Sequence, residues 1–160
     1  MNARTPLFHV LGLITCCLVT ACSNTMDFEE HRTFKGESWS MGEPLSFEFD
    51  ILDTAQPYML GLDIRYTNDF PWQDLFLFLN TTLPDGSRSR DTLHCLLFTP
   101  DGKPVGKGSR IKELETGYSL VRFPIPGHYT LQYIHGMREE QVHGIVSFGM
   151  SLKKNNPAKK

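Results

Sequence analysis

The sequence predicts an all-β protein, a single antiparallel β-sandwich with jelly-roll-like connections, placed after an N-terminal signal peptide. The chain has 160 residues, which is the length of one domain. Ten prolines and thirteen glycines leave little room for long helices. Short segments alternate apolar and polar residues with the period of a strand, and turn-forming residues separate them. Together these observations favour antiparallel sheets and argue against a helical bundle.

The N-terminal residues have the pattern of a secretion signal. A short segment that carries Arg4 precedes a run of thirteen mostly apolar residues, 7–19. This run is too short to span a bilayer, which takes roughly 20 residues. Val19-Thr20-Ala21-Cys22 then supplies a branched residue, two small residues and a cysteine, the lipobox pattern of bacterial lipoproteins. We expect a lipoprotein signal peptide at 1–21 and an acylated Cys22 that anchors the mature chain in a membrane. The alternative is an ordinary secretion signal followed by an unmodified cysteine.

The remaining chain is expected to contain one folded domain between two polar ends. Residues 22–37 are polar and acidic after the cysteine, show no sustained period, and are expected to form a tether. The β-sandwich is expected at 38–153 and a basic, flexible tail at 154–160. Once the signal is removed and Cys22 is acylated, only Cys95 is left, so an internal disulfide is excluded. We expect Cys95 to be a small, buried side chain.

Each expected strand follows from its own pattern. Residues 45–51 and 58–66 alternate strictly, which gives each strand one apolar face and one wet face. Residues 75–79 are apolar at every position, which predicts a central strand covered on both faces. Further strands are expected at 92–98, 118–123, 128–135 and 145–152. Turns are predicted at Pro84-Asp85-Gly86, Pro100-Asp101-Gly102 and Pro126-Gly127.

Composition and motifs exclude or disfavour several kinds of function. Sixteen basic residues against eighteen acidic ones argue against a nucleic-acid partner, which would need a basic face. Residues 102–109 resemble a phosphate-binding loop, but the spacing is one residue short and no helix follows, so we expect a turn. The histidines lack metal-ligand spacing, and no serine lies in a nucleophile elbow. We therefore expect no metal, no cofactor and no catalytic residues. An enzyme whose carboxylates meet only in the fold is the remaining alternative.

The loop after residue 65 carries the candidate contact residues. Tyr66, Phe70 and Trp72 place three aromatic rings around a break in the strand pattern. These rings could contact a protein partner or stack against a glycan. In the other interpretation, Phe70 and Trp72 close the open end of the sandwich.

The ordered motifs of the mature chain resemble the GldH family of gliding-motility lipoproteins of the Bacteroidota. The resemblance runs through nearly the whole mature chain and no single motif is diagnostic. The segments that carry it are Trp39 with 45–49, 58–71, 74–79, 83–86, 91–93, 100–103, 105–108, 123–124, 127–129, 137–138 and 144–149.

The resemblance implies a lipid-anchored protein of the cell envelope, in the outer membrane, that is needed for gliding and linked to type IX secretion. Its partners would be the membrane, through Cys22, and envelope proteins of the gliding and secretion machinery. In this interpretation the protein is a non-catalytic accessory or scaffold component and not an enzyme. The alternative is a carbohydrate- or peptidoglycan-binding module that uses the Tyr66–Trp72 loop. The oligomeric state stays open.

Overall fold

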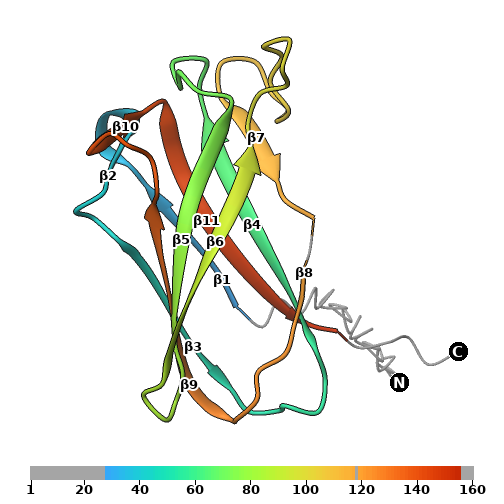
Figure 1. The fold of residues 1–160 in the computed structure, drawn as a ribbon. Coiled ribbons are helices and arrows are strands. Elements are labelled where there is room, and N and C mark those ends of the chain that lie inside the picture. The colour runs from blue at the N-terminus through green and yellow to red at the C-terminus, as the bar shows by residue number, and fades with distance from the viewer. Residues whose placement is uncertain (1–27, 118, 156–160) are drawn as a thin grey trace, which may run out of the picture.

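The computed structural model describes residues 28–117 and 119–155. These residues form two antiparallel sheets packed face to face, as Figure 1 shows, and a small two-stranded sheet at one end. The expected signal peptide, the expected lipid site Cys22 and residues 156–160 of the expected tail lie outside the described residues.

Each of the two large sheets is built from strands that are distant in the sequence. The first sheet has the order β1 (Phe28–Thr33), β11 (Ile145–Lys154), β4 (Tyr58–Tyr66), β7 (Lys112–Glu115), and β8 (Ser119–Val121) also pairs with β4. The second sheet has the order β3 (Leu45–Ile51), β9 (Gly127–His135), β5 (Asp74–Thr82), β6 (Arg88–Leu96). The small sheet pairs β10 (Gln141–His143) with β2 (Ser38–Ser40), and a 3-10 turn (Lys35–Glu37) precedes β2.

The connections are those of a jelly roll. Without the three-residue strands β2, β8 and β10, eight strands remain. In chain order, the first sheet then reads first-eighth-third-sixth, and the second reads second-seventh-fourth-fifth. This order arises when a long antiparallel hairpin is rolled up, so that successive strands mostly alternate between the sheets. The predicted fold class is therefore confirmed.

Aromatic side chains from both sheets fill the space between them. Phe47 of β3 lies edge-on to Tyr133 of β9, with ring centroids 5.8 Å apart. Phe148 of β11 reaches across from the first sheet to within 4.9 Å of the Tyr133 ring and 6.1 Å of the Phe47 ring. All three side chains are fully buried. The strict alternation in β3 and β9 aims these rings inward, so the pattern that predicts the strands also builds the core.

The predicted turns and the cysteine are found as expected. Gly86 and Gly102 have φ values of 83° and 77°, and each donates its N–H to a carbonyl three residues earlier. Residues 102–109 form bends with isolated bridges and no helix, and Lys107 exchanges backbone hydrogen bonds with Glu113 at 2.9 and 2.8 Å. Cys95 is buried, and this burial raises the pKa of its thiol to about 11.

Part of the expected tether belongs to the fold. Residues 28–33, which we expected to be a polar linker, form β1 and pair with β11 along their full length. Phe28 anchors the strand against the rings of Phe47 and Phe49, at 6.4 and 5.4 Å. The other side chains of β1 are polar because β1 is an edge strand held mainly through its backbone. At the other end of the chain, β11 extends to Lys154, one residue beyond the expected limit.

The prediction that residues 75–79 are covered on both faces is wrong. Leu75, Leu77 and Leu79 point into the core, while Phe76 and Phe78 lie on the outer face of the second sheet. No second layer lies over this face in the described part of the chain. Packing of the core therefore does not explain why phenylalanine occupies these two outward positions.

Candidate functional site

The aromatic loop suggested by the sequence is mostly inside the protein. Tyr66 is fully buried and its hydroxyl donates to the carbonyl of Leu97 at 2.6 Å. The same hydroxyl accepts the N–H of Gly106 at 2.9 Å. Burial raises the pKa of Tyr66, and the backbone N–H groups of Gly106 and Val105 partly offset that effect. Tyr66 thus ties β4 to the segment after β6, and its ring face is not available to a ligand.

Phe70 and Trp72 cover one end of the sandwich. Phe70 is 3% exposed and its ring stacks on Phe98 at 6.5 Å. Trp72 packs edge-on against Phe70 at 5.6 Å and is partly buried. Of the three predicted contact residues, Trp72 alone presents part of its ring to solvent, and a contact through it stays a prediction.

The exposed aromatic residues lie instead on the outer face of β5. Phe76 is 42% exposed, and its ring stacks on the imidazole of His94 at 5.0 Å with 14° between the planes. The Nε2 atom of His94 lies 2.6 Å from a carboxylate oxygen of Asp74. This contact holds the imidazole against Phe76. The ring of Phe76 is therefore fixed while one side stays open to solvent.

Phe78 extends the aromatic surface along the strand. The guanidinium of Arg90 lies 4.8 Å from the centre of the Phe78 ring, and Arg90 also donates to the side chain of Asn80 at 2.9 Å. On the other side, the Phe78 ring lies against Gly136, where a Cβ atom would come within 3.1 Å of it. Gly136 thus leaves room for Phe78 to lie flat at the end of β9.

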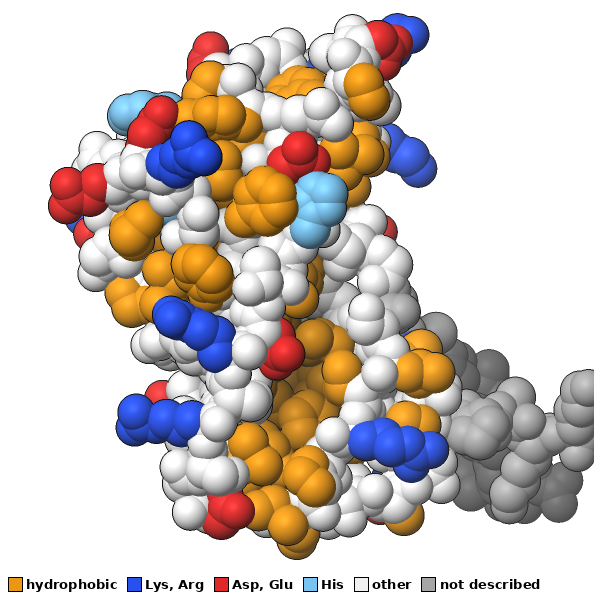
Figure 2. Space-filling view, in the orientation of Figure 1, with side chains coloured by type: hydrophobic (Ala, Val, Ile, Leu, Met, Phe, Trp, Pro, Cys, Tyr) orange, Lys and Arg blue, Asp and Glu red, His pale blue; other side chains and the backbone are white. Residues whose placement is uncertain are grey.

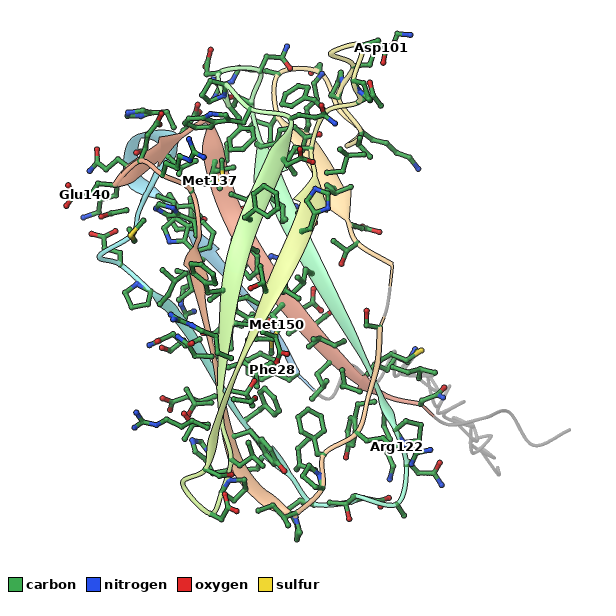
Figure 3. All side chains as sticks on the ribbon, in the orientation of Figure 1. Phe28, Asp101, Arg122, Met137, Glu140 and Met150 are labelled. Carbon is green, nitrogen blue, oxygen red and sulfur yellow. The ribbon has the colours of Figure 1, made fainter. Side chains whose placement is uncertain are left out.

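Neighbouring strands add apolar side chains to this surface. Leu96 is 37% exposed, and the sulfur of Met137 accepts the backbone N–H of Phe76 at 3.5 Å (Figure 3). Ile134 is opposite Phe78 in the β5–β9 register and is partly buried. We call the five residues Phe76, Phe78, Leu96, Ile134 and Met137 the apolar face. In Figure 2 apolar side chains gather on this upper part of the view, beside a histidine and an acidic side chain.

The lower half of the same sheet surface is polar. Asn80 and Thr82 follow on β5, Gln132 and Thr130 are opposite them on β9, and Glu48 is opposite Thr130 on β3. The outer surface of the second sheet is therefore divided into an apolar part and a polar part. The exposed Phe76 and the partly buried Phe78 and Met137, beside Arg90, have the composition of the centre of a protein interface.

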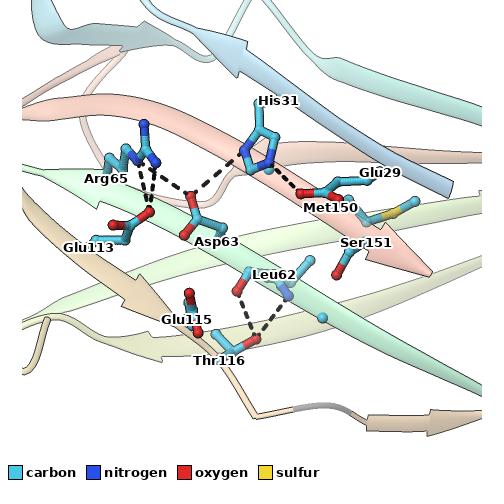
Figure 4. Close-up of a pocket in the computed structure, with 12 residues that line it drawn as sticks. Glu29, His31, Leu62, Asp63, Arg65, Glu113, Glu115, Thr116, Met150 and Ser151 are labelled. Atoms are coloured by element: carbon cyan, nitrogen blue, oxygen red, sulfur yellow. Dashed lines mark hydrogen bonds and ion pairs between the residues drawn. The ribbon is translucent and has the colours of Figure 1, made fainter. Parts of the chain in front are cut away.

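A second, polar surface lies on the outer side of the first sheet. Figure 4 shows a groove of about 230 Å³ at β1, β11, β4 and β7, where Arg65 donates to the Glu113 carboxylate at 2.7 and 3.1 Å. Asp63 lies at its floor, 3.8 Å from the Nδ1 atom of His31 and 3.9 Å from Arg65. Burial and the nearby Glu113 raise the pKa of Asp63, and Arg65 and His31 partly offset the shift. Arg65 is therefore a surface charge engaged in an ion-pair network.

The described part of the chain offers few other sites. Its His, Cys, Asp and Glu side chains form no group of three or more that could hold a metal ion. It contains no helix with the length and hydropathy of a membrane span. The apolar face is a site that the sequence interpretation missed. The sequence feature that indicates it is the uninterrupted apolar run 75–79, because such a run fits a strand with an exposed apolar face as well as a strand buried on both faces.

Comparison with known proteins relates the chain to gliding-motility lipoproteins. Residues 26–152 match the family described as GldH lipoprotein. The gliding motility lipoprotein GldH of Flavobacterium johnsoniae is 28% identical over 153 residues, which cover 90% of this chain and 94% of that protein. A GldH homologue of Christiangramia forsetii is 26% identical over 162 residues, which cover 96% of this chain and 99% of that protein.

Similarity to solved structures is much weaker. A crystal structure of dimeric latent PorU from Porphyromonas gingivalis aligns with a TM-score of 0.35 and 16% identity, over 80% of this chain and 11% of that one. This likeness carries no conclusion about function. The family match, in contrast, extends over most of the described domain, and the chain belongs to the GldH lipoprotein family.

Proposed function

We propose that this protein is a lipid-anchored envelope component that acts in gliding motility as a non-catalytic accessory or scaffold subunit. The relatives named gliding motility lipoproteins support the process, and the resemblance supports a link to the type IX secretion machinery. The lipid anchor is proposed at Cys22, in the outer membrane. The observation that carries the scaffold role is the apolar face, with Phe76 and Phe78 outward on a strand whose other face already fills the core.

The apolar face is suited to bind a protein partner. Phe76 and Phe78 lie on the same face of β5, and exposed apolar patches of this kind mark interaction surfaces. Phe76 is held by His94, and Phe78 is held between Arg90 and Gly136, so both rings lose little side-chain freedom on binding. The hydrogen-bonded pair of Asp74 and His94 at the border supplies a polar rim.

The carbohydrate-binding alternative has less support from the geometry. Of the three rings that it requires, Tyr66 and Phe70 are buried in the folded domain. A sugar platform needs ring faces that are open to solvent. Trp72 alone would have to supply the stacking surface, and its ring is partly covered by Phe70.

Affinity isolation from gently solubilised membranes tests the proposal. The tagged full-length chain would be compared with Phe76→Ser/Phe78→Ser, with Asn80→Ser/Thr82→Ser as the matched control on the polar half of the same strand, and with Cys22→Ala. We expect the chain and the matched control to co-purify with gliding or secretion subunits. The aromatic double variant and Cys22→Ala should lose them, the second because it no longer reaches the membrane.

Two outcomes would contradict the proposal. Equal recovery of partners by the aromatic double variant, with unchanged membrane location, would remove the apolar face from the interaction. Recovery of glycan or peptidoglycan fragments without protein partners, abolished by Trp72→Ala, would support the carbohydrate-binding alternative instead.

A further inference from the structure

The sandwich is open along one side. A trough of about 480 Å³ lies between β6 of the second sheet and β8 of the first, and Figure 2 shows it as an apolar hollow below the apolar face. Its walls include apolar side chains of both sheets and of the segments that follow β5 and β8: Leu60, Leu79, Leu83, Val121, Phe123 and Leu131. Arg88 and Asp91 of β6 also line it, together with Arg122 after β8. Figure 3 labels Arg122. We call this feature the edge trough.

The edge trough exists because β6 stops contributing apolar side chains to the core. In the β5–β6 register, Cys95 and Leu93 are opposite Leu75 and Leu77 and so share their inward side. The next two inward positions, opposite Leu79 and Thr81, are Asp91 and Ser89. Both side chains are exposed, and neither adds apolar surface to the core. They add no apolar cover at this end of the core, so the edges of Leu79 and Leu131 line the trough although both side chains are buried.

The strand beside the trough has a free edge. β6 is nine residues long and is the last strand of its sheet, so one row of its backbone N–H and C=O groups has no strand partner among the described residues. Such an edge is a template for one further strand. A strand added there would send alternate side chains inward, over the edge trough, where β6 itself presents Ser89 and Asp91.

We infer that the edge trough and the free edge of β6 together bind one extended segment of a partner protein, by strand addition. This inference rests on the proposed role as a partner-binding subunit and names the kind of segment that binds. The segment has apolar residues at every second position, which enter the trough. Its backbone pairs with β6.

The charges around the trough favour a partner segment with acidic flanks. Arg88 and Arg122 form no ion pair with any carboxylate in residues 28–117 and 119–155, and Asp91 is the single acid that lines the trough. A two-fold antiparallel pairing of two copies along the whole of β6 would place Arg88 opposite Leu96 and Arg90 opposite His94, so neither arginine would gain a carboxylate partner. A bare acyl chain would use the apolar walls and leave the backbone edge of β6 unpaired.

Binding of designed peptides to the mature lipoprotein in lipid nanodiscs tests this inference. The probes are nine-residue peptides with Glu at both ends and alternating Val and Thr between them. The control peptide has the same side chains, with N-methyl groups on alternate backbone nitrogens. We expect the probe to bind and the N-methylated peptide to bind at least tenfold more weakly. Hydrogen exchange should show new protection at those β6 amides that face away from β5.

Substitutions on β6 that fill the trough, or that lie on its opposite face, provide a matched pair of protein variants. Ser89→Val/Asp91→Val should weaken probe binding at least tenfold and raise the melting temperature, because the variant covers the core with its own side chains. The higher melting temperature also shows that the variant is folded. Thr92→Val, on the outward side of the same strand, should leave probe binding unchanged.

Several outcomes would overturn the inference. These are no probe binding at millimolar concentration, equal binding of the N-methylated peptide, displacement of the probe by palmitate, or dimerisation that the filled variant abolishes. The last two would assign the trough to an acyl chain or to a second copy of the chain. Loss of partner capture in the Phe76→Ser/Phe78→Ser variant is measured separately, so the proposed function can stand if the strand-addition inference fails.

Discussion

Gly144 and Phe70 approach each other so closely that a Cβ atom on Gly144 would lie 2.2 Å from the backbone nitrogen of Phe70. The carbonyl of Gly144 also accepts the N–H of Thr67 at 2.8 Å. The backbone before β11 is thus packed directly on the turn that carries Phe70. This contact fixes the aromatic end of the sandwich.

Gly144→Ala should destabilise the domain strongly. Gly144 has a φ of 81°, a conformation that by itself costs another residue on the order of 1–3 kcal/mol, and the backbone clash with Phe70 adds to that cost. Urea unfolding measures the effect. Gly117→Ala is the control, because a Cβ atom there meets nothing within 4 Å. If Gly144→Ala lost no more unfolding free energy than the control, the result would contradict the described packing.

Tyr66→Phe should cost about 1–3 kcal/mol of unfolding free energy without a change in overall structure. The variant keeps the ring but leaves the Leu97 carbonyl and the Gly106 N–H without their shared partner. Chemical denaturation with circular dichroism gives the value. A neutral effect would mean that water or a shifted loop replaces the hydroxyl.

Leu77→Ala and Phe76→Ala form a matched pair on adjacent positions of β5. Leu77 is fully buried, so its truncation should cost roughly 2–5 kcal/mol. Phe76 lies on the outer face and is 42% exposed, so its truncation should cost much less. If thermal unfolding showed equal losses of stability for the two variants, another part of the isolated protein would have to cover Phe76.

His135 should make the domain sensitive to mild acid. Its ring is fully buried, edge-on to Trp39 at 5.7 Å, and burial lowers its pKa below the ordinary 6.5, with a partial offset from backbone groups of Glu140 and Trp39. The unfolded chain then binds a proton at a higher pH than the folded one. The contribution of neutral His135 to the unfolding free energy is therefore complete above pH 6.5, and it decreases as the pH falls below that value.

A His135→Phe variant isolates this effect from the other histidines. Its unfolding free energy should decrease less than that of the parent between neutral pH and the window below pH 6.5. Denaturation curves at several pH values give the difference. Parallel pH profiles for the two proteins would show that His135 keeps an ordinary pKa in the fold.

Strands were predictable wherever one face is buried and the other is wet. In β3 and β4 the apolar residues alternate along the whole strand, and the structure has both strands at the predicted bounds. The strands β1, β2, β7 and β10 escaped prediction because they are short or held mainly through backbone pairing. Trp39, for example, is fully buried on a strand of three residues, which is too short to show a period.

The candidate site was harder to predict because a one-dimensional pattern does not tell which layer covers a residue. In the run 75–79 the sequence shows two apolar faces, and only the sheet order reveals that one of them has no cover. The burial of Tyr66 and Phe70 likewise depends on segments distant in the sequence, such as Leu97 and Gly144. Neither contact leaves a local signal.

The pairing of β1 with β11 has a mechanical consequence. Phe28 lies six residues after Cys22, and β1 is in register with β11 from Phe28↔Leu152 to Thr33↔Ser147. A pull on an anchor at Cys22 would enter the domain at Phe28 and act along the axis of β1. The backbone hydrogen bonds between the two strands would then be loaded in shear and share the force, instead of opening one after another. The strand β1, which we expected to belong to the tether, would then transmit tension from such an anchor into the first sheet.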